Sequence, residues 1–183
     1  MVADGLSRGV DTIEVSTVVA RQPRVVFAFL RDFTGYADYS KYLREVAIDG
    51  DGGVGTDYRL RFGWWRLTYD AFTRVTDLDE PKTLDWVVTE DIDARGRWVV
   101  EPADGDESVQ FDGGEGSRVS LVVEYDPASV SSGIVDLPAL VSMDWVVGVV
   151  VDLIEEEGQR VVSRVVADLE GEARDVELTV EYR

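Results

Sequence analysis

Apolar and polar residues alternate along much of the chain, which is the pattern of half-buried β-strands. The first such segment, residues 12–20, carries Ile13, Val15, Thr17 and Val19 on one face. Further alternating segments follow, separated by turns rich in Gly, Asp and Pro: 46–50, 56–63, 65–77, 82–90, 94–101 and 117–126. Because short turns join these segments, we expect them to pair as an antiparallel sheet.

Helical spacing interrupts this pattern after the first strand. Pro23 suits the first turn of a helix, and Gly35 suits its end. Apolar residues at i, i+3, i+4 and i+7 lie between them: Val26, Phe29, Leu30 and Phe33. The spacing then resumes and predicts a second short helix, with Tyr36, Tyr39, Leu43 and Val46 on its apolar face.

A long helix is predicted near the C-terminus, over about residues 137–169, with Gly158 inside its apolar stripe. A glycine within a helix indicates a kink or a close backbone approach. Asp144 and Asp152 interrupt the most apolar part, so we do not expect a membrane span. Residues 176–183 alternate again and predict a terminal strand.

The amino-acid composition limits the kinds of catalytic and metal-binding site that the chain can form. The chain has no Cys and no His, which removes thiolate nucleophiles, cysteine metal sites, the usual general base and the commonest metal ligand. Triad hydrolases and most zinc enzymes are therefore excluded, and we expect neither a metal nor a cofactor. Acid–base chemistry would need Asp, Glu, Tyr or Arg, with shifted pKa values for the carboxylates.

The chain is strongly acidic, with 37 Asp and Glu against 18 Lys and Arg and a net charge of −19. A basic partner is one explanation, but the acids are scattered, which favours a surface adapted to high salt, as in halophilic proteins. Nucleic-acid binding is disfavoured because no cluster of Lys and Arg is present. The N-terminus lacks the features of a signal peptide, so we expect a cytoplasmic protein.

The segment DGDGGVGT, residues 49–56, imitates two ligand-binding loops. It is rich in glycine like a phosphate-binding loop, but neither a helix nor a Lys follows it. As a calcium loop it has Gly53 and Val54 where a ligand and an obligatory Gly belong. We therefore predict a hairpin turn between two strands.

The run PRVVFAFLRDFTGYADYSKYLREV, followed by the strand GTDYRLRF, resembles a known family. It is similar to the start of the START-like, helix-grip proteins called polyketide cyclase/dehydrase, which include coenzyme-Q-binding proteins. The residues that carry the resemblance are Pro23, Phe27, Asp32, Phe33, Tyr36, Tyr39, Leu43 and Val46.

The resemblance implies an α+β fold of order β-α-α-β6-α, with a curved antiparallel sheet wrapped around the C-terminal helix. It also implies an internal apolar cavity that holds lipids, quinones, polyketides or steroids in different members, so function varies within one fold. It covers about residues 10–170. We expect one domain over residues 1–183, in which 171–183 is a C-terminal extension beyond the family's usual end.

Alternation assigns one face of the sheet to the interior, and aromatic rings with a polar handle suit a cavity for a flat, partly oxygenated ligand. The alternative is that these rings only fill a core. Combined with the two short helices and the long helix, this face gives the predicted ligand-binding residues: Phe29, Phe33, Tyr36, Tyr39, Tyr58, Leu60, Phe62, Tyr69, Trp86, Trp98, Val161 and Val165.

Charged strand residues fall on the opposite face, where we expect surface ion pairs: Arg59, Arg61, Asp70, Arg74, Asp85 and Arg97. The leading hypothesis is a protein that sequesters or presents a hydrophobic small molecule. The second is a cyclase or dehydratase that uses Tyr69, or Asp70 turned inward by a β-bulge, as its proton carrier. The third is a protein- or membrane-contacting module with an exposed patch at Trp64, Trp65 or Trp145.

Overall fold

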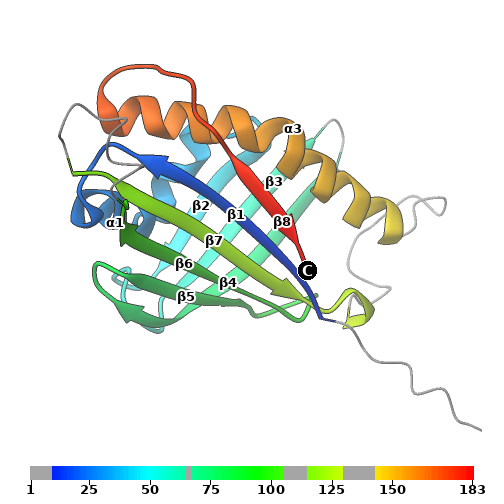
Figure 1. The fold of residues 1–183 in the computed structure, drawn as a ribbon. Helices are drawn as coiled ribbons and strands as arrows, with labels where there is room; N and C mark the ends of the chain where they lie inside the picture. Colours follow the sequence, from blue (N-terminus) through cyan, green and yellow to red (C-terminus); the bar gives the residue numbers. More distant parts are fainter. Residues whose placement is uncertain (1–9, 65–66, 105–114, 130–142) are drawn as a thin grey trace, which may run out of the picture.

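The computed structural model describes residues 10–64, 67–104, 115–129 and 143–183, and all their side chains except those of 64–67 and 143–156. Its central element is an eight-stranded antiparallel sheet (Figure 1). In spatial order the strands are β2 (Leu43–Asp49), β3 (Asp57–Trp64), β4 (Leu67–Asp79), β5 (Thr83–Val88), β6 (Ala94–Pro102), β7 (Ser117–Tyr125), β1 (Asp11–Val19) and β8 (Thr179–Tyr182). Every strand predicted from alternation is present within three residues of its expected bounds.

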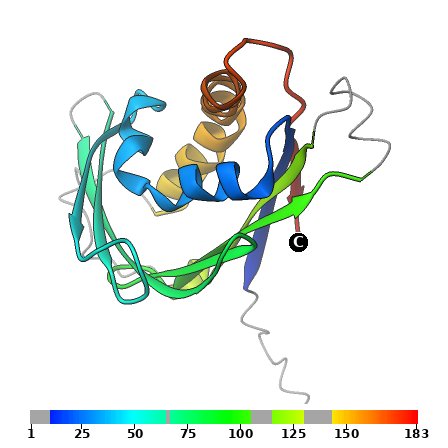
Figure 2. The same cartoon turned by 90° about the vertical axis from the view of Figure 1, so that its left-hand side faces the viewer.

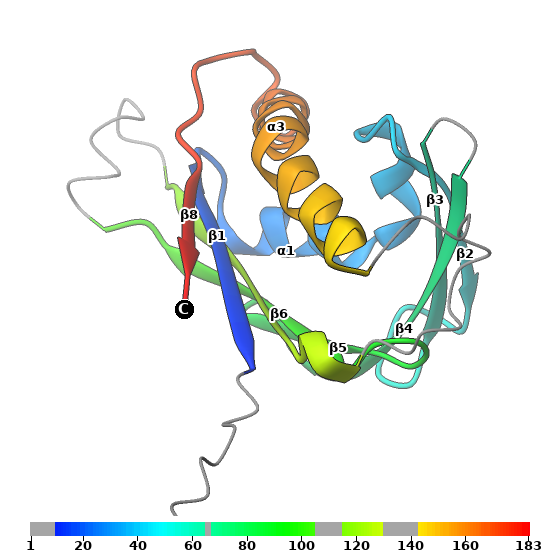
Figure 3. The ribbon, with the colours of Figure 1, turned by 90° about the vertical axis from the view of Figure 1, so that its right-hand side faces the viewer.

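The sheet curves strongly, and the helices lie on its concave side (Figures 2 and 3). The long helix α3 (Met143–Glu170) crosses this side, with α1 (Pro23–Arg31) and the 3-10 helix η1 (Phe33–Asp38) beside it. This arrangement is the predicted helix-grip fold. Residues 137–142, predicted as the start of the long helix, lie outside the described residues. None of the helices in the described part of the chain is long and apolar enough to cross a membrane.

Helix α1 forms where the sequence predicted it but ends earlier. Pro23 opens the helix, and Val26, Phe27 and Leu30 are buried on one face. The helix stops at Arg31, and Gly35, which was expected to end it, lies inside η1.

The second predicted helix is a short 3-10 helix, η1. Asp32 opens it by accepting a hydrogen bond from the backbone N of Thr34 at 3.2 Å. Leu43 and Val46, predicted on the apolar face of this helix, instead lie in strand β2. Extending the helical spacing past residue 38 was wrong, because a spacing of three also joins residues of a bulged strand, and β2 shifts its register between Leu43 and Glu45.

Residues 49–56 form the connection between β2 and β3, as predicted. Gly50, Gly52 and Gly55 all have positive φ angles, which residues with a Cβ rarely adopt. The buried Thr56 hydroxyl accepts a hydrogen bond from the backbone N of Gly52 at 3.0 Å and holds the loop closed. The glycines of this segment thus serve the turn.

The hydrophobic core fills one end of the concave side, the end where α3 finishes. We call this the closed end. There α1, η1 and the last turns of α3 pack on the sheet, and the backbone N of Ala20 donates to Glu170 at 2.7 Å. The buried core residues are Val19, Val26, Phe27, Leu30, Phe33, Tyr58, Val75, Leu84, Val100, Val119, Val166 and Val176.

The chain after α3 returns along the sheet edge and adds β8 beside β1, which confirms the predicted terminal strand (Figure 1). Gln159 donates to the carbonyl of Val176 at 2.7 Å, and Thr17 donates to the carbonyl of Glu177 at 2.8 Å. Leu178 lies over Gly158 of α3, but a Cβ on Gly158 would lie 3.7 Å from Cδ2 of Leu178, an ordinary van der Waals distance, so the contact does not require a glycine. Residues 171–183 therefore cover an edge of the sheet that would otherwise be exposed.

Candidate functional site

The concave face carries a row of half-buried aromatic side chains beyond the closed end. Cross-strand pairing places them on one face: Phe62 lies opposite Tyr69, and Trp98 lies opposite Leu84 on one side and Leu121 on the other. We call the set the aromatic floor: Phe62, Tyr69, Trp86 and Trp98. All four are partly exposed, and Trp86 and Trp98 contact the core cluster at one edge.

Trp86 owes its position to a glycine. It lies opposite Gly96 in β6, and its ring occupies the space where a Cβ on that residue would lie. A Cβ placed on Gly96 would come within 2.1 Å of Cζ2 of Trp86, far inside van der Waals contact. Gly96 therefore makes room for the indole against the sheet, a role that the sequence pattern alone did not indicate.

Five of the predicted ligand-binding residues pack against one another at the closed end. The centroid of the Phe33 ring lies 4.8 Å from that of Tyr58 and 5.1 Å from that of Tyr36, and the Phe29 centroid lies 5.4 Å from that of Tyr39. Phe33 and Tyr58 are buried members of the hydrophobic core. This cluster is solid, so Phe33 and Tyr58 belong to the core.

The hydroxyls of the other two tyrosines of this cluster donate hydrogen bonds within the protein. Tyr36 donates to the carbonyl of Leu30 at 2.6 Å, and burial raises its pKa well above the ordinary value. Tyr39 donates to Asp168 of α3 at 2.9 Å, and its carbonyl accepts from Arg164 at 2.7 Å. The Tyr36 bond ties η1 to α1, and the two Tyr39 bonds tie the end of η1 to α3.

Tyr69 is the polar residue of the aromatic floor. Burial, together with the negative charge of nearby Asp91, raises the pKa of Tyr69 to about 12. Asp70, the alternative proton carrier, does not turn inward. It lies on the convex face and accepts two hydrogen bonds from Arg61 at 2.8 Å each, since the bulge of β4 falls later, between Val75 and Asp77.

On α3, the described residues that reach the core are Val162, Val166 and Leu169. Val161 and Val165, predicted to line the cavity, are half-buried on the neighbouring part of the helix surface. The side chains of residues 143–156, where α3 faces the rest of the concave side, lie outside the described residues.

Glu157 is a buried carboxylate that sequence reasoning missed. It lies between α3 and the start of β2, 3.5 Å from Lys41 Nζ and 3.2 Å from Arg160, and its Oε1 has no hydrogen-bond partner among the described residues. Burial raises its pKa, but hydrogen bonds and charges from Arg160 and Lys41 outweigh burial and hold the pKa below its usual value. It ties α3 to residue 41.

The convex face carries the predicted ion pairs. Arg61 pairs with Asp70, Arg97 with Asp85, and Arg74 with Asp57 at 2.7 Å. Arg59 pairs with Glu45 at 2.9 Å. The prediction of surface ladders is confirmed, and this face offers no buried charge pair for chemistry among its described residues.

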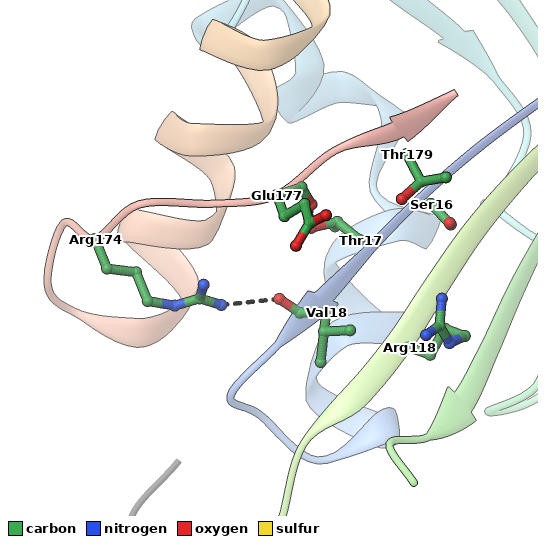
Figure 4. Close-up of a pocket in the computed structure, with 7 residues that line it drawn as sticks. All are labelled: Ser16, Thr17, Val18, Arg118, Arg174, Glu177 and Thr179. Atoms are coloured by element: carbon green, nitrogen blue, oxygen red, sulfur yellow. Dashed lines mark hydrogen bonds between the residues drawn. The ribbon is translucent and has the colours of Figure 1, made fainter. Parts of the chain in front are cut away.

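An open polar pocket of about 270 Å³ lies where β8 leaves β1 (Figure 4). It is lined by Ser16, Thr17, Val18, Arg118, Arg174, Glu177 and Thr179. Arg174 donates to the carbonyl of Val18 at 2.8 Å and to Glu170 at 2.8 and 2.9 Å. These contacts dock the C-terminal segment, and the pocket is separate from the concave face.

Two further expectations, a contact patch around three tryptophans and the absence of a metal site, concern residues that the structure describes only in part. The proposed contact patch at Trp64, Trp65 and Trp145 rests on side chains outside the described residues. Within the described residues, no group of three or more acidic side chains could hold a metal ion.

Comparison with known proteins supports the same fold. The structure is similar to the Zhui aromatase/cyclase from Streptomyces sp. R1128, with a TM-score of 0.62 and 17% identity, over 88% of this chain and 94% of that protein. It is also similar to Ara h 8.0201, with a TM-score of 0.56 and 18% identity, over 89% of this chain and 99% of that one. At such identity the likeness shows the helix-grip fold alone.

No curated protein gives a significant match to the sequence. A family model does match: residues 11–170 fit the family described as polyketide cyclase/dehydrase and lipid transport, and this range ends where α3 ends. The match confirms the resemblance seen in residues 23–46 and leaves β8 as an addition. The chain therefore belongs to the polyketide cyclase/dehydrase and lipid transport family of START-like proteins.

Proposed function

We propose that the protein binds a hydrophobic small molecule between the aromatic floor and α3. The observation that carries this proposal is a contrast along the strands of one sheet. Val75, Leu84 and Val100 at the closed end are each 1% exposed, whereas the aromatic floor on the same face is only half-buried. If the core were closely packed along the whole concave face, it would bury both the valine and leucine residues and the aromatic floor. The partial exposure of the aromatic rings therefore favours a cavity that a ligand can fill.

A flat or polycyclic apolar molecule suits this surface, with a lipid or isoprenoid quinone ahead of a polyketide. Burying its apolar area supplies about 25 cal/mol per Å² and needs no catalytic group. The family description includes both lipid transport and cyclase or dehydrase activity, so it agrees both with a ligand-carrying protein and with an enzyme.

Binding of the neutral fluorophore N-phenyl-1-naphthylamine tests the proposal. We expect saturable binding by the wild type and a loss of about fivefold in affinity in Trp98→Leu, because an aromatic contact contributes about 1 kcal/mol beyond its area. Phe72→Leu is the matched control, since Phe72 lies on the convex face of β4 opposite Arg59 and its loss should leave affinity unchanged.

Extraction of the protein from its native host, followed by mass spectrometry, should identify a co-purified lipid or quinone. Failure of the fluorophore to bind, together with an extract that holds no apolar compound above the level of a control protein, would contradict the proposal.

A cyclase or dehydratase is the second candidate, and the observation that favours it is the half-buried hydroxyl-bearing side chain of Tyr69 on the concave face, opposite Phe62. A tyrosine beside a bound substrate can exchange a proton with it. In that case Tyr69→Phe would abolish turnover of a polyketide-like substrate while fluorophore binding persists. A carrier would show binding and no turnover in either form.

A further inference from the structure

A second pocket lies at the end of the sheet opposite the closed end, where β1 begins and β8 finishes. It has a volume of about 280 Å³ and is lined by Asp11, Thr12, Ile13, Tyr125, Tyr182 and Arg183. Strand register places four of these side chains on the concave face, since Tyr125 lies opposite Asp11 and Tyr182 lies opposite Ile13. The pocket therefore shares a face of the sheet with the aromatic floor.

Two tyrosines flank β1 at this pocket. Tyr125 belongs to β7 and Tyr182 to β8, the two neighbours of β1, and side chains stand roughly perpendicular to a sheet (Figure 1). With about 4.8 Å between strands and an offset of two residues, the bases of the two rings lie about 12 Å apart. A ring held midway would lie about 6 Å from each tyrosine, within the roughly 4.5–7 Å range of aromatic pairs. Ile13, which is 6% exposed, forms the floor between them.

The charge at this pocket favours an uncharged ring over an anionic one. Arg183 turns its guanidinium away from the concave face, since it donates to Glu181 at 2.8 Å and to Glu14 at 3.2 Å, which pair with each other on the convex face. Asp11 lies on the concave face, and burial together with the charge of Asp11 raises the pKa of Tyr125. A ligand that enters from the concave side therefore meets a negative charge.

A continuous row of residues connects this pocket with the aromatic floor. From Trp86 the row passes through Gly96 in β6, Val123 in β7 and Ile13 in β1 to Tyr182 in β8. One glycine and two aliphatic residues thus lie between the aromatic ends of the row. A ligand with its ring in the pocket can extend an apolar chain along this row toward Trp86.

Tyr182 comes from a segment that the family match does not include. The match ends at residue 170, whereas Thr12 and Arg183 exchange two backbone hydrogen bonds of 2.8 Å that hold the end of β8 beside β1. Tyr182 is 50% exposed, although it lies opposite the buried Ile13. A large ring that is half exposed at the wall of a pocket is well placed to contact a ligand.

We propose that Tyr125 and Tyr182 form a tyrosine clamp over Ile13, which holds an uncharged planar ring at one end of the bound ligand. This inference rests on the proposed function, since the rest of that ligand lies on the aromatic floor. The clamp makes β8 part of the binding site, and Asp11 disfavours ligands with an anionic group on the ring.

Two alcohols with the same number of carbon atoms test the clamp by displacing N-phenyl-1-naphthylamine. The ring of 6-phenylhexan-1-ol is planar and that of 6-cyclohexylhexan-1-ol is puckered, so the ratio of their affinities measures the preference for a planar ring. In Tyr182→Ala and in Tyr125→Leu this ratio should fall about fivefold, because each variant loses one aromatic contact. Tyr182→Phe and Tyr125→Phe should keep the wild-type ratio, since the ring face rather than the hydroxyl makes the contact.

A second pair of ligands tests Asp11. In Asp11→Asn the affinity for 4-hexylbenzoate should rise about threefold relative to that for 4-hexylbenzyl alcohol, the effect of one charge at about 6 Å in water. Thr179→Val is the matched control for both ratios. Thr179 also lies in β8 but faces the convex side opposite Ser16, and valine keeps the preference for a strand.

The outcomes separate the clamp from the proposed function. A phenyl-to-cyclohexyl ratio that is unchanged in both Tyr182→Ala and Tyr125→Leu, or that falls equally in Thr179→Val, would overturn the clamp and leave apolar binding intact. Failure of both alcohols to displace a bound fluorophore would have the same meaning. Absence of fluorophore binding by the wild type would instead overturn the proposed function, and the clamp with it.

Discussion

Gly96 and Trp86 show how one residue without a side chain shapes the site. The indole lies over the backbone of β6, where any other residue would place a Cβ inside the ring. Trp86 therefore lies low on the sheet and leaves the space above it to other atoms. A larger residue at position 96 would lift the ring into the region between the aromatic floor and α3.

Gly96→Ala is expected to lower the free energy of unfolding by about 1–3 kcal/mol, the usual cost of overpacking. It should also weaken N-phenyl-1-naphthylamine binding, because the displaced ring occupies the ligand's space. Urea unfolding and the fluorophore titration measure the two effects. Gly35→Ala is the matched control, since nothing lies within 4 Å of a Cβ there. An unchanged affinity in Gly96→Ala would show that Trp86 does not border the site.

At the scale of elements, the spacing of apolar residues and the positions of turn residues were sufficient to predict the strands of the sheet and the presence of α3. Strands with one buried face alternate strictly between apolar and polar residues. Their approximate bounds and the direction of their side chains could therefore be predicted from the sequence, including the position of Arg61 and Arg97 in ion pairs on the convex face. The second helix was misjudged, because a run of six residues gives too few repeats to separate a 3-10 helix from the start of strand β2.

The candidate site was predictable only in part, for physical reasons. Alternation put Tyr69, Trp86 and Trp98 on the concave face. It could not show that Phe33 and Tyr58 are enclosed by core while Phe62 is not, because that depends on where α1 and α3 pack. Asp91, whose charge acts on Tyr69, escaped notice because loop residues follow no period.

Glu157 links elements that are far apart in sequence, and its contribution to stability depends on pH. Its folded-state pKa is depressed, so the contribution is present above the unfolded value near 4.5 and is lost as pH falls through the folded value. The cations around it are half-exposed, with 53% of the Lys41 and 60% of the Arg160 side chain accessible, which limits the gain through solvent screening.

Glu157→Gln should therefore lower the free energy of unfolding by about 1–2 kcal/mol at pH 7, through loss of the charged hydrogen bond that Glu157 accepts from Arg160 and of its ion pair with Lys41. The deficit should shrink as pH falls from 5 to 3, where the wild type loses the same contribution. Urea unfolding across this range is the measurement. The exposed Glu172, just beyond α3, supplies the control variant Glu172→Gln, with no expected change. A deficit independent of pH would contradict the role given to the Glu157 charge.

For the whole molecule, the balance of charge is uneven. Arginines on the convex face are matched by acids, as in the pairs Arg59–Glu45, Arg74–Asp57 and Arg95–Glu124. The excess behind the net charge of −19 is therefore carried by acids without such partners, and their mutual repulsion opposes the compact state. Salt has two opposing effects here, since it screens the repulsion and also weakens the pairs.

Repulsion should dominate, because exposed pairs contribute about 0–1 kcal/mol each whereas the surplus acts over the whole surface. We expect the melting temperature to rise by about 4–8 °C, equivalent to roughly 2 kcal/mol, as sodium chloride increases from 10 mM to 1 M. Most of the rise should come early, as the Debye length falls from about 30 Å at 10 mM to about 10 Å at 0.1 M. Choline chloride at equal ionic strength should reproduce that early rise if screening is the cause. A melting temperature that falls with salt would show that the ion pairs outweigh the repulsion, and would remove the basis for salt adaptation.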